Sequence, residues 1–158
     1  MTARHLEYTR TFPVSVEHAY DVVLPAPLPT IFRRRYLAIA PIAEVAGPDG
    51  DWGTATGQTR TIRMQDNGTM LETLTSIERP HHFGYTISGI TGAMKPLVTE
   101  AQGVWAFEPA GTGVRITWSW DVTPTARLGR AAMPVFSRLW QGYARQAFDE
   151  IERLLLPR

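Results

Sequence analysis

The chain has 158 residues, of which 44% are hydrophobic and 20% charged, and its formal net charge is +1 at pH 7. This length predicts one domain over residues 1–158, long enough to bury roughly 70% of its unfolded surface. The balanced charge predicts neither a nucleic-acid partner nor binding to an anionic membrane. Because the chain has no cysteine, disulfides, thiolate metal sites and cysteine nucleophiles are excluded.

Targeting and membrane signals are absent from the sequence. The segment Met1–Glu7 lacks the apolar core of a signal peptide, and no window approaches the ~20 consecutive apolar residues of a membrane span. We therefore expect a cytoplasmic protein without stable membrane insertion, present as a monomer or a homodimer.

The first elements are one strand and two short helices. Alternation predicts a strand over Leu6–Phe12, and Ser15 is a suitable N-cap for a helix over Val16–Val23. Pro25 ends this helix, because proline is incompatible with a helix interior. A second short helical stretch is expected over Leu28–Phe32.

Six strands follow, each reached by a short turn, which predicts an antiparallel meander. Their expected ranges are Leu37–Val45, Thr54–Met64, Thr69–Ile77, Phe83–Ser88, Val98–Phe107 and Val114–Val122. The last strand alternates without exception. Its even positions, which include Trp118 and Trp120, are apolar and share one buried face.

The end of the chain shows helical periodicity, with an apolar stripe that includes Phe136, Trp140 and Tyr143. We expect a break at Pro134, with a separate turn or short helix over Ala126–Met133. The i,i+4 spacing predicts surface ion pairs between Arg145 and Asp149 and between Asp149 and Arg153.

Short motifs accompany this order of elements. They are Gly57-Gln58-Thr59-Arg60, Asp66-Asn67-Gly68, Glu72-Thr73-Leu74, Glu78-Arg79-Pro80, Trp105-Ala106-Phe107-Glu108-Pro109 and Gly113-Val114-Arg115-Ile116-Thr117. Together they resemble the helix-grip fold of the START-like superfamily, also called SRPBCC, and within it the polyketide cyclase/dehydrase and lipid-transport group. The resemblance implies an α+β fold in which a seven-stranded curved antiparallel sheet wraps around the long C-terminal helix and leaves a cavity between them.

The register across the Asp66-Asn67-Gly68 turn decides which residues face that cavity. A three-residue loop pairs Met64 with Met70, Ile62 with Glu72 and Arg60 with Leu74. The even positions then form the less polar face and point inward. A two-residue turn over Asn67-Gly68 would break this parity.

If the even positions point inward, Arg60 and Glu72 are neighbours inside the cavity. Opposite charges on adjacent strands can pair, which lowers the cost of taking them out of water. In hormone receptors that the chain resembles, a glutamate at the position matching Glu72 lies in the ligand cavity. The pair either anchors a polar group of the ligand or is a structural ion pair at the sheet rim.

Aromatic and aliphatic side chains should complete the cavity wall. The full set of expected ligand-binding residues is Arg60, Ile62, Met70, Glu72, Leu74, Phe83, Tyr85, Ile87, Trp105, Phe107, Trp118, Trp120, Trp140 and Tyr143. The alternative is that the aromatic residues are ordinary core. The segment Gly89–Leu97 resembles the cavity-gating loop of the superfamily and is either a lid or a plain hairpin loop.

These patterns favour binding of a small hydrophobic metabolite: a lipid, a polyketide or an aromatic compound. One alternative is an aromatase/cyclase enzyme with Glu72, Tyr85 or Tyr143 as acid or base, and another is a co-chaperone-like protein-binding module. We expect no cofactor and no metal, since His81 and His82 point to opposite faces of a strand and the chain has no nucleotide motif. The run Arg33-Arg34-Arg35 is expected to be a solvated surface.

Overall fold

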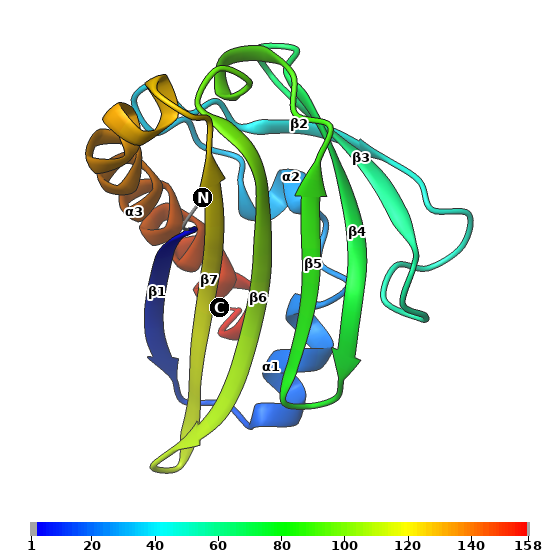
Figure 1. Ribbon diagram of the computed structural model, residues 1–158. Coiled ribbons are helices and arrows are strands. Elements are labelled where there is room, and N and C mark those ends of the chain that lie inside the picture. Colours follow the sequence, from blue (N-terminus) through cyan, green and yellow to red (C-terminus); the bar gives the residue numbers. More distant parts are fainter. Residues whose placement is uncertain (1–2, 158) are drawn as a thin grey trace.

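A computed structural model describes residues 3–157, and it contains one sheet and three α-helices (Figure 1). The elements are β1 Arg4–Phe12, α1 Val16–Val23, α2 Leu28–Ile31, β2 Ile42–Ala46, β3 Thr59–Met64, β4 Thr69–Glu78, β5 His82–Ser88, the 3-10 helix η1 Gly92–Met94, β6 Val98–Ala110, β7 Gly113–Pro124 and α3 Leu128–Leu155. The strands lie in the order β1-β7-β6-β5-β4-β3-β2, and all neighbours are antiparallel. The predicted helix-grip fold is confirmed.

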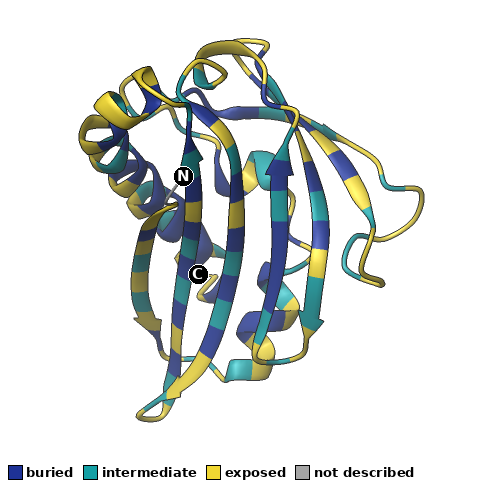
Figure 2. Ribbon diagram, viewed as in Figure 1, coloured by how far each residue is buried: buried dark blue, intermediate teal, exposed yellow. Residues whose placement is uncertain are grey.

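The sheet curves around the helices, and the core lies between them (Figure 1). Buried and more exposed positions alternate along the strands (Figure 2), as the period of two requires. In β7 the predicted apolar face, which includes Trp118 and Trp120, is buried. Within residues 3–157, no helix is long and apolar enough to cross a membrane.

The helices follow their sequence signals, with one exception. The Ser15 hydroxyl caps α1 by accepting the N–H of His18 at 3.1 Å. The predicted break at Pro134 is wrong, because α3 runs unbroken through it. Pro134 has no N–H to donate to the Arg130 carbonyl. Both residues are exposed, so water can satisfy the carbonyl that proline leaves free.

Two strands begin later than predicted. β2 starts at Ile42 rather than Leu37, because residues 36–41 fold back on themselves through a Tyr36–Ile39 bridge. Leu37 has a positive φ of 48°, which interrupts an extended strand. β3 starts at Thr59 rather than Thr54, because the preceding residues form a loop around the Gln58 side chain, which accepts the backbone N–H of Gly53 at 2.8 Å.

The β3–β4 register differs from the predicted one by two residues. Arg60 lies directly opposite Glu72, not opposite Leu74. The loop has three residues, as expected, but it comprises Gln65, Asp66 and Asn67, and Met64 N–H donates to the Gly68 carbonyl at 2.8 Å. Asn67 adopts a left-handed φ of 70°, the conformation that a three-residue hairpin loop requires. A shift of two residues preserves parity, so the even positions still face inward.

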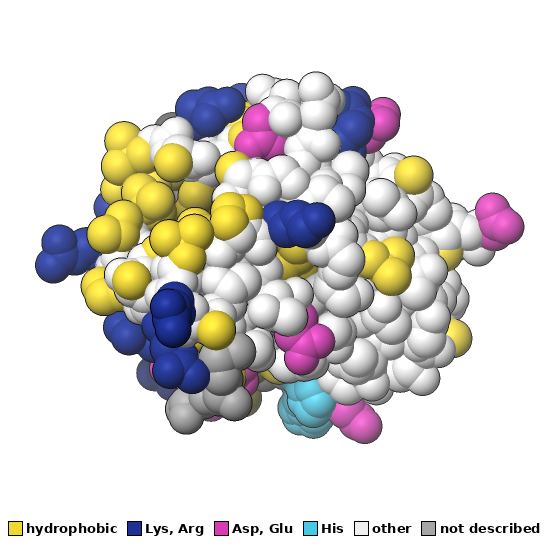
Figure 3. All heavy atoms as spheres, turned by 45° about the horizontal axis from the view of Figure 1, so that its top comes forward, with side chains coloured by type: hydrophobic (Ala, Val, Ile, Leu, Met, Phe, Trp, Pro, Cys, Tyr) yellow, Lys and Arg dark blue, Asp and Glu magenta, His cyan; other side chains and the backbone are white. Residues whose placement is uncertain are grey.

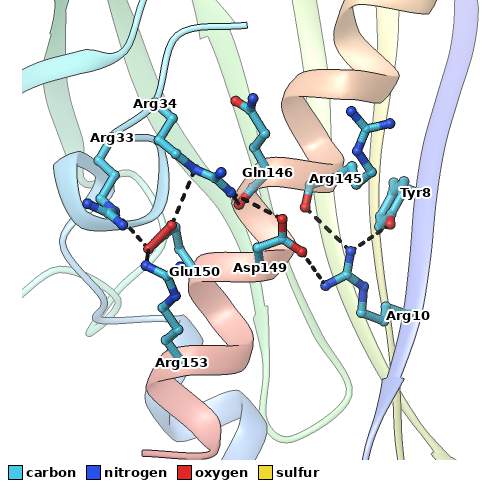
Figure 4. Close-up of polar contacts among 9 residues, drawn as sticks. All are labelled: Tyr8, Arg10, Arg33, Arg34, Arg145, Gln146, Asp149, Glu150 and Arg153. Carbon is cyan, nitrogen blue, oxygen red and sulfur yellow. Dashed lines mark hydrogen bonds and ion pairs between the residues drawn. The ribbon is translucent and has the colours of Figure 1, made fainter.

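The surface ion pairs predicted within α3 are wrong (Figure 4). Asp149 accepts hydrogen bonds from Arg10 at 2.9 Å and Arg34 at 3.1 Å, and Arg153 pairs with Glu150 at 3.3 Å. The tertiary fold brings β1 and the segment after α2 against α3, and arginines from those segments take the place of the helical partners. The run Arg33-Arg34-Arg35 is therefore partly an anchor to α3, because Arg33 also binds Glu150 at 2.8 Å.

Candidate functional site

A cavity lies between the concave face of the sheet and the helices. Every residue predicted to line it does so except Leu74 and Phe107. Those that do are Arg60, Ile62, Met70, Glu72, Phe83, Tyr85, Ile87, Trp105, Trp118, Trp120, Trp140 and Tyr143. Leu74 and Phe107 are buried in the core instead. Tyr20 of α1 covers Phe107, with ring centroids 5.3 Å apart.

The cavity is small in this conformation. The room open to the centre of a water molecule is about 70 Å³, whereas all the empty space between the lining atoms, including that open to solvent, is about 790 Å³. The smaller volume determines how much the cavity can hold, because about 10–15 Å³ of such room holds one water molecule. In this conformation the cavity therefore takes a few waters or a small ligand, and a larger ligand requires side chains to move.

Sequence reasoning missed the side of the cavity that lies away from the sheet. The additional lining residues come mainly from α1, α2 and the segments around β2, η1 and α3: Val23, Leu24, Leu28, Ile31, Phe32, Ile39, Ile42, Met64, Met94 and Phe136. The position of Phe136 in the cavity wall could have been predicted, because it lies one helical turn before Trp140 on the apolar stripe of α3. Met64 lies on the even face of β3, which parity predicts to point inward. The others are apolar residues of short elements, whose orientation local periodicity does not determine.

The wall formed by β3 and β4 carries a buried ion pair. Arg60 Nε donates to Glu72 Oε1 at 2.6 Å, and the two side chains are 9% and 5% exposed. The Arg60 guanidinium carbon also lies 3.9 Å from the ring centroid of Trp52, in the loop before β3. Burial raises the pKa of Glu72, and the charge and hydrogen bond of Arg60 oppose that rise.

Tyr85 of β5 links two tryptophans of β7. Its oxygen accepts the indole N–H of Trp118 at 2.7 Å and that of Trp120 at 2.8 Å. The ring can lie there because Gly103, its partner on β6, has no side chain, and a Cβ at Gly103 would overlap the ring. Burial raises the pKa of the Tyr85 hydroxyl, so Tyr85 stays protonated at neutral pH.

Tyr143 ties α3 to the chain segment before β2. Its hydroxyl donates to the Ala40 carbonyl at 3.1 Å, and its ring stacks on Phe32 with centroids 5.3 Å apart. Burial raises its pKa as well. With its proton held by a backbone carbonyl, Tyr143 is placed to hold the cavity wall together rather than to act as a base.

The β6–β7 side of the cavity is filled by stacked rings. Trp118 stacks on Trp105 and on Trp140, with centroid distances of 5.3 Å and 4.5 Å, and Phe148 stacks on Trp105 at 5.7 Å. The two interpretations of the aromatic residues, as cavity wall and as ordinary core, are therefore compatible, because the same rings form both.

The segment Gly89–Leu97, expected to be either a lid or a plain hairpin loop, contains η1 and contributes Met94 to the cavity wall. Thr91 holds it to β4, because the Thr69 N–H donates to Thr91 Oγ1 at 2.8 Å. Among residues 3–157, no group of three or more His, Cys, Asp or Glu side chains is arranged to hold a metal ion.

Comparisons with known proteins agree with this geometry. Residues 3–155 match the model of a family described as polyketide cyclase/dehydrase and lipid transport. The chain belongs to this family, within the SRPBCC superfamily. No match was found among curated proteins.

Solved structures share the fold at low identity. Ginseng major latex-like protein 151 from Panax ginseng superposes with a TM-score of 0.73 at 13% identity, covering 99% of this chain and 100% of that one. Ara h 8.0201 gives a TM-score of 0.67 at 19% identity, covering 99% of each chain. Protein Ms6760 from Mycobacterium smegmatis gives 0.66 at 16% identity, covering 100% of this chain and 98% of that one. At these identities the likeness shows the fold alone.

Proposed function

We propose that the protein binds a small hydrophobic molecule in the cavity between the sheet and α3. The observation that carries this proposal is a cavity wall made almost wholly of apolar and aromatic side chains, with one buried ion pair, Arg60–Glu72, on it. Apolar burial supplies affinity, at about 25 cal/mol per Å². The ion pair orients a polar group of the ligand. Family membership supports the same class of ligand.

Ligand access depends on side chains that can move. Met64, Met70 and Met94 line the cavity, and unbranched methionine side chains adapt their shape at low energetic cost. We expect a lipid, polyketide or aromatic ligand to displace these methionines rather than the stacked tryptophans. This explains how a cavity of about 70 Å³ can accept a larger molecule.

A second candidate function is acid–base catalysis of the cyclase type, and a single group favours it. Glu72 lines the cavity, and burial raises the pKa of its carboxyl group, which favours the protonated form that a general acid needs. Tyr85 and Tyr143 are weaker candidates, since burial raises their pKa values and both hydroxyls take part in internal hydrogen bonds. An enzyme of this kind would therefore depend on Glu72.

Native mass spectrometry and a fluorescent probe test the binding proposal. The probe is anilinonaphthalene sulfonate, with emission and quenching of the cavity tryptophans as readouts. Ile87→Trp fills the cavity and should weaken probe binding by about tenfold or more, equivalent to about 1.4 kcal/mol. Thr86→Trp, one residue away on the outer face of β5, is the matched control and should bind as the wild type does.

Equal affinity in both variants would show that the probe binds elsewhere, and the proposal would fail. The catalytic candidate is tested by Glu72→Gln on a poly-β-ketone mimic. If this variant binds the mimic but no longer turns it over, Glu72 acts as a catalyst. If the wild type binds the mimic without turnover, the protein is a binder only.

A further inference from the structure

One end of the molecule brings three segments together beside the cavity. Residues 91–97, which contain η1, lie against the start of α3, where the Thr125 N–H donates to the Leu97 carbonyl at 3.0 Å and the Thr125 hydroxyl to the Pro96 carbonyl at 2.6 Å. Residues 36–41 join the same end, because the Ala40 carbonyl accepts the Tyr143 hydroxyl. Ile39 and Met94, which are partly exposed, line the cavity from these two segments.

Large apolar side chains are exposed on this end. Leu37 is 70% exposed, Val135 62% and Leu128 57%, the three highest values among the exposed large hydrophobic residues. Ala131 and Pro134 are exposed on α3 beside them. Figure 3 shows hydrophobic side chains gathered on one side of this end. The same turns of α3 bury Met133 and Phe136 on the inner face, so the start of α3 carries apolar side chains on its inner face and on its solvent-exposed side.

A helix that is apolar on its solvent face indicates a partner. Isolated exposed leucines are common on protein surfaces, but Leu128, Ala131, Pro134 and Val135 lie within the first turns of α3, and Phe136 of the same turns lines the cavity. We refer to Leu37, Leu128, Ala131, Pro134 and Val135 as the apolar face. It is separate from the cavity wall, because none of its members lines the cavity.

The charges next to the apolar face are basic. Between Asp121 and Asp149 the charged residues are Arg127, Arg130, Arg138 and Arg145, without a single Asp or Glu. Lys95 is exposed on the adjoining segment. None of Lys95, Arg127, Arg130 and Arg138 takes part in an ion pair within residues 3–157.

Acidic side chains also occur at this end (Figure 3). One is Asp66 of the β3–β4 loop, which accepts the Gly68 N–H at 3.0 Å and lines the small hollow next to Met94. These acidic side chains do not reverse the positive charge on the first turns of α3. The overall charge of +1 therefore conceals a local excess of unpaired basic groups around the apolar face.

We propose that this end of the protein docks on an anionic lipid surface. The apolar face enters the interfacial layer, and Lys95, Arg127, Arg130 and Arg138 lie at the level of the lipid phosphates. An apolar surface bordered by basic residues is the pattern of proteins that lie on a membrane. A second copy of the chain fits less well, because a symmetric contact would bring the same arginines together.

Docking would bring the cavity to the membrane. Ile39 and Met94 belong to the segments that surround the apolar face, so a hydrophobic ligand could pass between bilayer and cavity without crossing bulk water. The docking proposal does not depend on ligand binding, because the apolar face and the cavity wall share no residue.

Vesicle co-sedimentation tests the proposal with the full chain. The wild type should bind mixed phosphatidylcholine–phosphatidylglycerol vesicles, bind phosphatidylcholine vesicles at least about tenfold more weakly, and dissociate at high salt. Leu128→Asp/Val135→Asp and Arg127→Gln/Arg130→Gln/Arg138→Gln should each weaken binding to the mixed vesicles by about tenfold or more. Leu71→Asp, at an exposed leucine on the outer face of β4, is the matched control and should bind normally.

Far-ultraviolet circular dichroism and cooperative unfolding identify any variant that fails to fold. Both sets of substitutions lie on the surface. If the variant with either set folds and loses vesicle binding, that result is enough to judge the proposal. The proposal is overturned if the wild type binds neither vesicle, if Leu71→Asp loses as much binding as Leu128→Asp/Val135→Asp, or if those two substitutions dissolve a dimer without changing lipid binding. Ile87→Trp should keep vesicle binding, which separates failure of docking from failure of ligand binding.

Discussion

The two halves of the sheet differ in what fills the space beside them. The half formed by β1, β7 and β6 is filled by rings, with Phe148 of α3 packed against Tyr8 of β1 at 4.8 Å and Trp105 of β6 at 5.7 Å. The residues of β2, β3 and β4 that line the cavity include no aromatic ring, and β3 and β4 carry the Arg60–Glu72 pair. α3 contacts β1 and β7 most closely among the strands. One long helix therefore fills the space beside β1, β7 and β6, and the cavity lies between the resulting stack of rings and the rest of the curved sheet.

The largest expected effect compares truncations in the two halves. Phe148→Ala should lower the free energy of unfolding by about 3–5 kcal/mol, because it opens a cavity in a fully packed stack. Met70→Ala should lower it by about 2 kcal/mol, at the lower end for such changes, because Met70 already borders empty space. Urea unfolding measures both. Equal losses would mean that the β2–β4 half is packed as tightly as the other.

The next prediction concerns the ion pair in the open half. Arg60→Met should cost about 3 kcal/mol of unfolding free energy, because it leaves the Glu72 carboxylate buried without its partner. Arg60→Met/Glu72→Leu should restore most of the loss. If the double variant is as unstable as the single one, the arginine contributes through its stacking on Trp52 rather than through the pair.

The loss of stability in Arg60→Met should depend on pH. The folded-state pKa of Glu72 lies above its ordinary value of 4.5. The contribution of this group to the free energy of unfolding is therefore complete below pH 4.5 and is lost as pH rises through the folded pKa. Removing Arg60 raises that pKa further. The deficit of Arg60→Met should therefore shrink as pH is lowered from 7 toward 4.5. A deficit that stays constant would contradict a buried, ionised Glu72.

A smaller effect is expected where α3 meets the segment before β2. A Cβ at Gly142 would overlap the ring of Tyr36, so Gly142→Ala should displace residues 36–41 and cost about 1–3 kcal/mol in urea unfolding. In a Tyr36→Ala background the same change should be neutral or stabilising, since alanine favours a helix over glycine by about 1 kcal/mol. A loss in both backgrounds would mean that the close contact is not the cause.

The smallest effect is expected on the surface of the packed half. Burial alone would raise the pKa of Asp149, but hydrogen bonds from Arg10 and Arg34 outweigh it and hold the pKa below 3.8. A depressed pKa contributes stability above the unfolded value and loses it as pH falls below 3.8 through the folded pKa. Asp149→Asn should cost about 0.5–1 kcal/mol at pH 7, because Asp149 is partly exposed. That difference should vanish once the pH falls well below the folded pKa. A deficit that persists in acid would point to lost packing.

Most of the cavity wall could be predicted because a strand has a simple period. Parity placed Ile62, Met70 and Glu72 on one face even though the predicted register was wrong by two residues, since a shift of two keeps every side chain on its face. The opposite wall had no such rule. Phe32 and Ile39 belong to short or irregular segments whose orientation depends on what they pack against.

The sequence by itself determined the order of elements, the inward face of each strand and the apolar stripe of α3, because these follow from local periodicities of two and 3.6 residues. The tertiary structure alone decided which charges meet, how much of the interior stays empty, and where exposed apolar residues gather. Asp149 bonds to Arg10 and Arg34, which are remote in sequence, rather than to its helical neighbours. Leu37 and Val135 come to the same end of the molecule although they are 98 positions apart in the sequence, 135 minus 37. Such contacts depend on the path of the whole chain, which no local pattern records.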